Sequence, residues 1–233
     1  MKKLHEKLIV ALDSKELWQS KSLLSKLENK VSFYKIGLRT FVMNGFNLVD
    51  EIKEKGNRIF LDLKLFDIKS TIEETVTKLS EKKIDFLTVH GDPSVVEAAL
   101  NGRKDKNMKI LAVTFLTNQN RNDLDLSLIK AGNLNDLVAE RANNAFMAGA
   151  DGIICSPLEA SLIRSKRQYS NKIIVTPGVR LKNSNKEDQK RVSTPAEAIK
   201  AGANYIVVGR PIWNATNPIS AIDNIINNIS NNL

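Results

Sequence analysis

The sequence predicts a single-domain α/β fold, a (β/α)8 TIM barrel that occupies residues 1–233. Short apolar runs alternate with amphipathic stretches eight times along the chain. Such alternation indicates a parallel sheet with right-handed crossover connections. No linker and no change in composition divides the chain. Eight units in this length fit a closed barrel better than the alternative, an open doubly wound sheet.

Each expected strand is a short run of mostly apolar residues, which is typical of strands buried on both faces of a parallel sheet. The first run ends in a carboxylate, Asp13, and the second contains a lysine, Lys35. In order, the expected strands are residues 8–13, 33–37, a run that begins near 58, 85–90, 109–115, 152–156, 172–176 and 205–209.

Apolar residues recur at helical spacing between these strands. Leu17, Leu23, Leu24 and Leu27 give residues 15–27 an apolar face, and Ser14 is the expected N-terminal cap of that helix. The other expected helices are a stretch that reaches about residues 55–56, then 72–82, 93–100, 134–147, 157–165, 194–200 and 218–229. Residues 116–132 are expected to form a longer polar connection with at most a short helix.

Composition and charge narrow the range of functions. Hydrophobic residues make up 42% of the chain and charged residues 26%, as in ordinary globular proteins. The net charge of +9 is compatible with an anionic substrate. The densest basic stretches are short and contain no aromatic residues for base stacking, so we expect no nucleic-acid partner.

Cys155 is the only cysteine, which excludes an intrachain disulfide and a cysteine-based metal cluster. It lies in an apolar run and is expected to be buried. Glu6 interrupts the basic N-terminus, and the apolar run after it is too short for the core of a signal peptide. No apolar run approaches the roughly 20 residues that cross a bilayer, so we expect a cytoplasmic protein without a membrane partner.

The chemistry concentrates in residues 58–71, RIFLDLKLFDIKST. Alternation along a strand puts Asp62 and Lys64 on the same face, and Asp67 follows where the strand should have ended. Charges on an otherwise buried strand are costly unless they meet a partner or a ligand. The stretch is therefore a candidate site, with a structural ion pair at a strand end as the alternative.

Other polar residues collect where the remaining strands of a barrel would end, which is where such barrels hold their active sites. The loops after the seventh and eighth strands are the usual phosphate site, and they carry Gly178, Arg180, Gly209 and Arg210. Residues 181–191 are too polar to pack as core. We expect a mobile lid over the phosphate at about residues 180–192, with Gln189 at its tip; a disordered surface loop is the alternative.

Three motifs together carry a family resemblance. Asp62-x-Lys64-x-x-Asp67-Ile68, the run VTPGVR at 175–180 and the run VVGRPI at 207–212 resemble the orotidine 5′-phosphate decarboxylases, in their short bacterial type. The resemblance covers nearly the whole chain. The first motif alone is shared with sugar-phosphate lyases, whereas its combination with the lid is more specific.

The resemblance implies decarboxylation of orotidine 5′-monophosphate to uridine 5′-monophosphate (UMP) and CO2 in de novo pyrimidine biosynthesis, with no cofactor and no metal. Lys64 would be the proton donor of a charge array with Lys35, Asp62 and Asp67, and Asp67 would be shared across a homodimer interface. The implied substrate-binding residues are Asp13 and Lys35 at the ribose, Ile68 and Thr71 from the partner subunit, Thr117 at the base, and Pro177, Arg180, Gln189, Gly209 and Arg210 around the phosphate. His90 would lie at the rim without an assigned role.

The chain departs from the family beside Asp67. Lys69 and Ser70 stand where the family usually has Pro or Gly and often Asn, and Phe66 replaces a common His. We expect these changes to affect the backbone rigidity beside Asp67 and the local dimer contacts more than the chemistry. Two rivals stay open: a Mg2+-dependent sugar-phosphate lyase with a metal at Asp13 and Asp62, and a catalytically silent barrel that binds nucleotides or nucleic acid.

Overall fold

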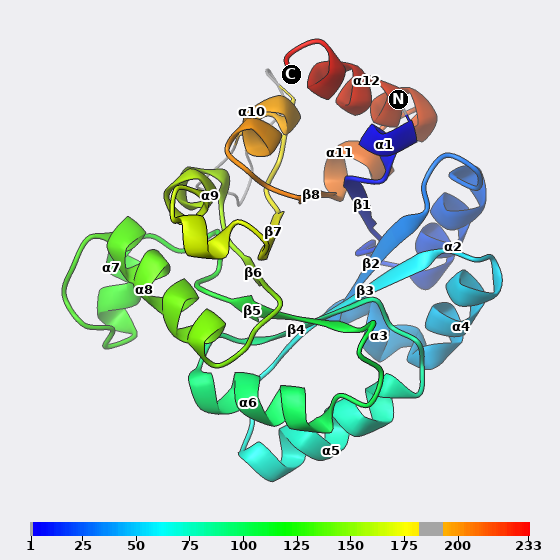
Figure 1. Cartoon of the computed structure of the whole chain (residues 1–233). Helices are drawn as coiled ribbons and strands as arrows, with labels where there is room; N and C mark the ends of the chain where they lie inside the picture. The colour runs from blue at the N-terminus through cyan, green and yellow to red at the C-terminus, as the bar shows by residue number, and fades with distance from the viewer. Residues whose placement is uncertain (1, 182–192) are drawn as a thin grey trace.

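A computed structural model describes residues 2–181 and 193–233 of the chain, with side chains from residue 4 onward (Figure 1). Eight parallel strands pair in sequence order, and the pairing of the first with the eighth closes the barrel. The closed barrel confirms the predicted fold class and excludes the open sheet. The strands are β1 (Leu8–Ala11), β2 (Phe33–Gly37), β3 (Arg58–Leu65), β4 (Phe86–His90), β5 (Lys109–Val113), β6 (Gly152–Ile154), β7 (Ile173–Thr176) and β8 (Tyr205–Val208).

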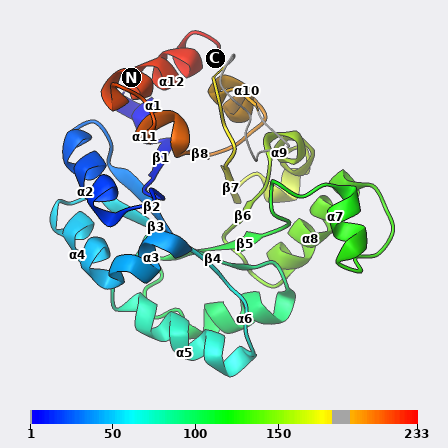
Figure 2. The same ribbon diagram turned by 180° about the vertical axis from the view of Figure 1, so that it is seen from behind.

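Helices surround the barrel on all sides, as the view from behind also shows (Figure 2). Among the described residues, none of the helices has the length and apolarity to span a membrane. They are α1 (Lys2–His5), α2 (Leu17–Lys26), α3 (Leu38–Asn44), α4 (Phe46–Glu54), α5 (Lys69–Ser80), α6 (Pro93–Gly102), α7 (Arg121–Leu126), α8 (Leu134–Met147), α9 (Pro157–Arg164), the 3-10 helix η1 (Arg167–Tyr169), α10 (Pro195–Lys200), α11 (Arg210–Trp213) and α12 (Pro218–Ser230).

The interior of the barrel is filled from its N-terminal end. Phe33, Phe86 and Tyr205 pack edge to face there, with ring centroids 5.0 to 5.7 Å apart. The guanidinium of Arg58 lies 4.0 Å from the centre of the Phe33 ring and pairs with Asp85. This aromatic and cationic plug closes one end of the barrel, so a ligand can enter only from the carboxyl ends of the strands.

Several element boundaries differ from the predicted ones. The expected single helix after β2 is two helices, because Gly45 adopts φ +50° and ψ −132° and interrupts the helical hydrogen bonding. Glu16, not Ser14, is the N-cap of α2, and Ser14 instead donates a hydrogen bond to the Glu16 carbonyl. Helix α5 begins at Lys69, three residues earlier than predicted. Helix α8 has the predicted bounds.

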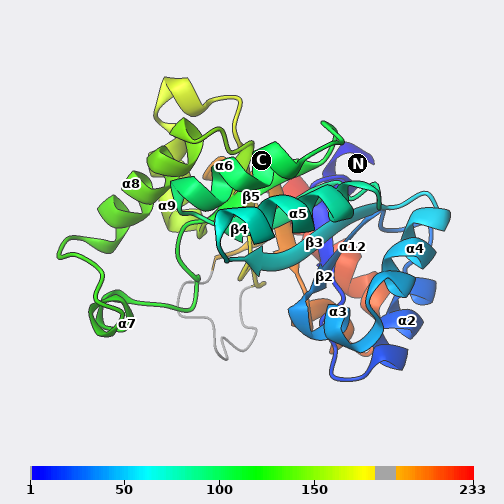
Figure 3. The same ribbon diagram turned by 90° about the horizontal axis from the view of Figure 1, so that it is seen from below.

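The predicted polar connection between β5 and α8 contains one short helix, α7. Asn120 caps its first turn and accepts a hydrogen bond from the Asp123 backbone. Figure 3 shows α7 set apart from the neighbouring α8. The connection between β5 and α8, which contains α7, therefore begins at the carboxyl end of β5 and extends away from the barrel.

Candidate active site

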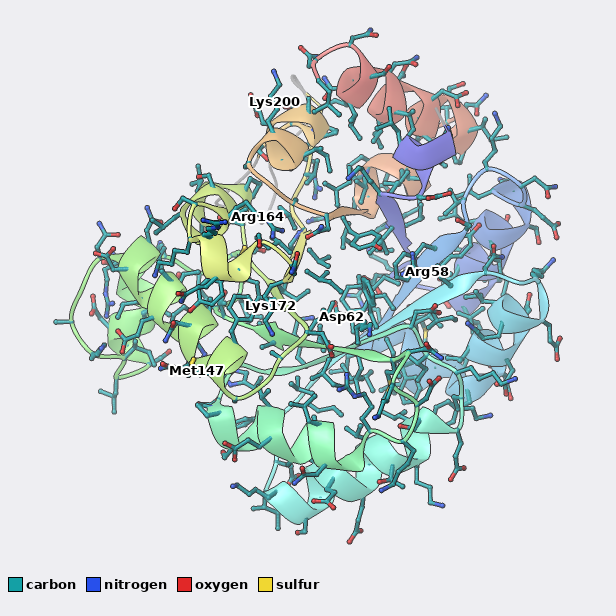
Figure 4. All side chains as sticks on the ribbon, viewed as in Figure 1. Arg58, Asp62, Met147, Arg164, Lys172 and Lys200 are labelled. Carbon is teal, nitrogen blue, oxygen red and sulfur yellow. The ribbon has the colours of Figure 1, made fainter. Side chains whose placement is uncertain are left out.

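A cavity of about 390 Å³ opens at the carboxyl ends of the strands. Its size suits a small-molecule ligand. Figure 4 shows Asp62 within the ring of strands, whereas Met147 and Lys200 lie among the outer helices. Most of the predicted site residues line this cavity: Asp13, Lys35, Asp62, Lys64, Thr117, Pro177, Arg180, Gly209 and Arg210.

Four charged side chains alternate in sign along one wall of the cavity. The Lys35 ammonium lies between two carboxylates, in direct contact with Asp13 and 3.3 Å from Asp62 Oδ2. The other oxygen of Asp62 is 2.8 Å from Lys64 Nζ. Lys35 and Asp62 are buried, whereas the side chain of Lys64 is 38% exposed. Lys64 and Asp13, at the two ends of this chain of ion pairs, are both accessible from the cavity, because the side chain of Asp13 is 34% exposed.

Burial and the neighbouring charges have opposite effects on the pKa of Lys35 and on that of Asp62. Burial favours the neutral form of Lys35, but the carboxylates of Asp62 and Asp13 outweigh it and raise the pKa of Lys35. Burial likewise opposes ionisation of Asp62, yet Lys35 and Lys64 lower its pKa below the ordinary value of 3.8. A raised lysine pKa and a lowered aspartate pKa keep both groups charged across the neutral range.

The backbone is irregular where the array meets β4. Lys64 has φ +50°, the left-handed region that costs a residue with a side chain roughly 1–2 kcal/mol. The pairing of β3 with β4 shifts register between Leu61 and Leu65. Regular alternation correctly predicted that Asp62 and Lys64 meet, but the strand reaches that arrangement through a bulge.

Asp13 is held by the backbone of β2. The Gly37 amide donates to Asp13 Oδ1 at 3.0 Å. A Cβ at position 37 would lie 2.5 Å from that oxygen and 3.0 Å from Lys35 Nζ, so the arrangement requires glycine. The Leu12 carbonyl, directly before Asp13, accepts hydrogen bonds from the buried hydroxyls of Thr40 and Ser20. The turn after β1 is therefore fixed on both sides.

Glycines and arginines that follow β7 and β8 also line the cavity, and β8 is the strand next to β1 in the barrel. Arg180 is buried, and its amide donates to the Ser193 carbonyl at 2.9 Å. A β-bridge joins Val179 to Ser193, so the two ends of the intervening segment lie together. Gln189 and most of the predicted lid lie outside the described residues.

Three predicted site residues are not brought to the cavity by their own chain. Asp67, Ile68 and Thr71 are exposed at the end of β3 and the start of α5. The Ile68 amide donates a hydrogen bond to Asp67 Oδ1 at 2.7 Å. Phe66 and Ile68 are 66% and 70% exposed. These residues form a protruding rim segment, residues 66–71, that is available to another molecule.

His90 does not line the cavity. Its Nδ1 is 2.6 Å from Asp92 Oδ2 and 2.9 Å from Arg141 Nη2, and its ring packs on Phe66 with centroids 4.7 Å apart. Arg141 in turn lies over the ring of Phe115, which is part of the cavity wall. The sequence placed His90 at the rim correctly, and its contacts there are structural.

Sequence reasoning missed several residues at the cavity. Phe115 and Asn118 flank Thr117 after β5, where the strand-end rule could have found them. Trp213 belongs to α11, a four-residue helix that has too little periodicity to be recognised. Thr88 does not line the cavity, but its hydroxyl donates to Asp62 at 2.9 Å. A threonine inside an apolar strand gave no signal of that contact.

Comparisons with known proteins point to one family. Residues 6–225 match the family model described as "Orotidine 5'-phosphate decarboxylase / HUMPS family". The orotidine 5'-phosphate decarboxylase of Ruegeria pomeroyi is 53% identical over 222 residues, 95% of this chain and 92% of that protein. The protein of that name from Jannaschia sp. is 52% identical over 95% of this chain and 97% of its own. The crystal structure of orotidine 5'-phosphate decarboxylase from Lactobacillus acidophilus superposes with a TM-score of 0.82 at 32% identity, over 96% of this chain and 99% of that one.

Proposed function

This chain belongs to the orotidine 5′-phosphate decarboxylase / HUMPS family, and from that membership we propose that its cavity converts orotidine 5′-monophosphate to UMP and CO2 without a cofactor. The observation that carries the proposal is one cavity lined by two chemically distinct groups. One group is the alternating array of Asp13, Lys35, Asp62 and Lys64. The other is a pair of arginines, Arg180 and Arg210, suited to a phosphate. This reaction belongs to pyrimidine biosynthesis.

Lys64 is the group we assign to the reacting carbon. Loss of CO2 from C6 of the pyrimidine leaves a carbanion that the ring delocalises poorly. An ammonium fixed beside C6 stabilises that charge and then donates a proton to it. Asp62 lies 2.8 Å from Lys64 Nζ and holds the ammonium in place through an ion pair. Lys64 lines the cavity, so a bound substrate can reach its ammonium.

The phosphate lies far from the reacting carbon, so its binding energy can orient the substrate and order the array. We assign Arg180, Gly209 and Arg210 to the phosphate, with Pro177 in the same loop. Thr117 would contact the base, and Asp13 with Lys35 the ribose hydroxyls. The proposal also includes a contact from Gln189 to the phosphate and closure of the lid, both of which are predictions from the sequence.

The rim segment supports a homodimer. Asp67, Ile68 and Thr71 are exposed and do not line their own cavity, and the large apolar side chain of Phe66 is exposed beside them. Exposed apolar side chains on a short protruding segment are typical of an interface. We therefore assign these three residues to the active site of a second copy of the chain, where Asp67 would complete the charge array.

The metal-dependent alternative uses the same carboxylates differently. A Mg2+ ion held by Asp13 and Asp62 would have to replace the Lys35 ammonium, which contacts both carboxylates. The raised pKa of Lys35 opposes its release as a neutral amine. The array therefore favours the cofactor-free reaction over a Mg2+-dependent lyase.

The deciding experiment follows the ultraviolet absorbance of orotidine 5′-monophosphate with purified protein in EDTA. We expect the orotate absorbance to disappear and UMP to form. EDTA should not prevent this, because no metal takes part in the proposed reaction. Absence of turnover at high enzyme concentration would refute the function. Turnover of a sugar phosphate that depends on Mg2+, with none of orotidine 5′-monophosphate, would favour the metal-dependent rival.

Replacing Arg210 with alanine should mainly weaken substrate binding. Loss of one charge-assisted contact to a phosphate should raise KM for orotidine 5′-monophosphate roughly 10- to 100-fold. Because the reacting carbon is remote, kcat should change less than KM. Arg121→Ala is the matched control, since Arg121 pairs with Asp125 within α7. Steady-state kinetics that show an unchanged KM for Arg210→Ala would contradict the assignment.

A further inference from the structure

We propose that Thr88 is a positioning residue, whose hydroxyl fixes the Lys64 backbone and the Asp62 carboxylate in one arrangement. The inference rests on the proposed function, because it concerns the array assigned to decarboxylation. Thr88 lies on β4, is fully buried, and is not part of the cavity wall. Any effect on catalysis must therefore pass through the residues that it contacts.

The Thr88 hydroxyl joins two parts of the array. Its Oγ1 accepts a hydrogen bond from the Lys64 amide at 3.0 Å and donates one to Asp62 Oδ1 at 2.9 Å. A hydroxyl has one proton to donate and lone pairs to accept with, so the single Thr88 hydroxyl can serve both contacts. The same Oδ1 accepts from Lys64 Nζ at 2.8 Å. Backbone amide, hydroxyl, carboxylate and ammonium thus form a closed ring of interactions.

The strand register explains why this position carries the hydroxyl. Leu61 pairs with Leu87, and Leu65 pairs with Val89. Three residues of β3, numbers 62 to 64, therefore lie opposite one residue of β4, which is Thr88. The bulge turns the Lys64 amide out of the regular ladder, and a side-chain oxygen accepts its hydrogen bond instead.

Lys64 also has the left-handed conformation, at φ +50°. Such a conformation persists in a residue with a side chain only when its surroundings enforce it. The hydrogen bond from the Lys64 amide to Thr88 is one such constraint. Without it, the bulge could relax toward a regular strand and move the ammonium away from Asp62. Thr88 therefore sets the position of the reacting group from behind the cavity.

The test compares Thr88→Val, Thr88→Ser and Thr176→Val in the full-length protein. Valine keeps the shape of threonine and removes the hydroxyl, whereas serine keeps the hydroxyl. Thr176 is a matched control on β7, because it is also fully buried and, within the part of the chain that the structure describes, its hydroxyl has no hydrogen-bond partner.

For Thr88→Val we expect kcat for orotidine 5′-monophosphate to fall roughly 10- to 100-fold, the scale of a misplaced catalytic group. The change in KM should be less than about threefold, because the phosphate residues are untouched. Thr88→Ser should retain most of the activity, and Thr176→Val should match the wild type. Should Thr88→Val fail to fold, Thr88→Cys replaces it, since a thiol is a poor hydrogen-bond partner.

Three results would overturn the inference: a wild-type kcat for Thr88→Val, an equal loss for Thr88→Ser, or a loss confined to KM. In each of these the wild-type protein still turns over, so the proposed function survives. A wild-type protein without turnover would instead refute the proposed function, and this inference with it. Circular dichroism and thermal unfolding of every variant identify losses that come from misfolding.

Discussion

Replacing Lys64 with alanine should lower kcat for orotidine 5′-monophosphate by more than about 1000-fold, while the protein stays folded. Removal of a single preorganised group that stabilises developing charge costs roughly 100- to 1000-fold in other enzymes. Lys64 would supply both that stabilisation and the proton, so its loss should exceed this range. Because Lys64 stands at one end of the ion-pair chain, its truncation leaves the contact between Lys35 and Asp62 in place.

The measurement is single-turnover and steady-state decarboxylation, with thermal unfolding as the check on folding. Lys82→Ala is the control, because Lys82 also pairs with an aspartate, Asp50, at 3.0 Å but lies outside the cavity. It should keep the wild-type kcat. Turnover near the wild-type level in Lys64→Ala would refute the role assigned to this lysine.

The barrel itself could be predicted because every strand is a short apolar run and the chain contains no interruption. Parallel strands buried on both faces need continuous apolar sequence, and the helices between them need an amphipathic face. The exact ends of the helices could be predicted less well. The break at Gly45 depends on a single backbone conformation, and α11 is too short to show a period.

The site could be predicted in its residues but not in its local geometry. The rule that barrel strands end at one rim brought Asp13, Lys35, Asp62 and Lys64 together before any coordinates. The bulge at Lys64 could not be predicted from the sequence, because it arises from the register between β3 and β4. The role of Thr88 follows from that register and was invisible for the same reason.

The rim segment illustrates a third feature that one sequence does not determine, namely a contact between two copies of the chain. The resemblance assigned Asp67 to the charge array, yet this chain leaves Asp67 exposed at the end of β3. A contact between copies depends on the surface of both, and one chain contains half of it. The departures at Phe66 and Lys69 lie in this same segment, and Lys69 pairs with Glu97 of α6 at 3.3 Å. The segment is thus anchored to its own barrel on one side and exposed on the other.

Mixing two inactive variants should restore activity if Asp67 acts in the neighbouring subunit. Asp67→Asn alone should lower kcat at least about 100-fold, because the array loses one of its charges. A hybrid dimer of Lys64→Ala and Asp67→Asn chains contains one site with both native residues and one with neither. Purified with a different tag on each chain, the hybrid should show about half of the wild-type activity per dimer.

The alternative, in which Asp67 acts within its own chain, gives the opposite result. Each site of the hybrid would then carry one defect, and the hybrid would be as inactive as its parents. The control is a hybrid of Lys64→Ala with Asp62→Asn, whose substitutions affect residues that touch within one chain. There each site is defective, and no recovery should occur. Recovery in the Asp67 hybrid alone would place its carboxylate in the partner's cavity and explain why the apolar side chains of Phe66 and Ile68 are exposed beside it.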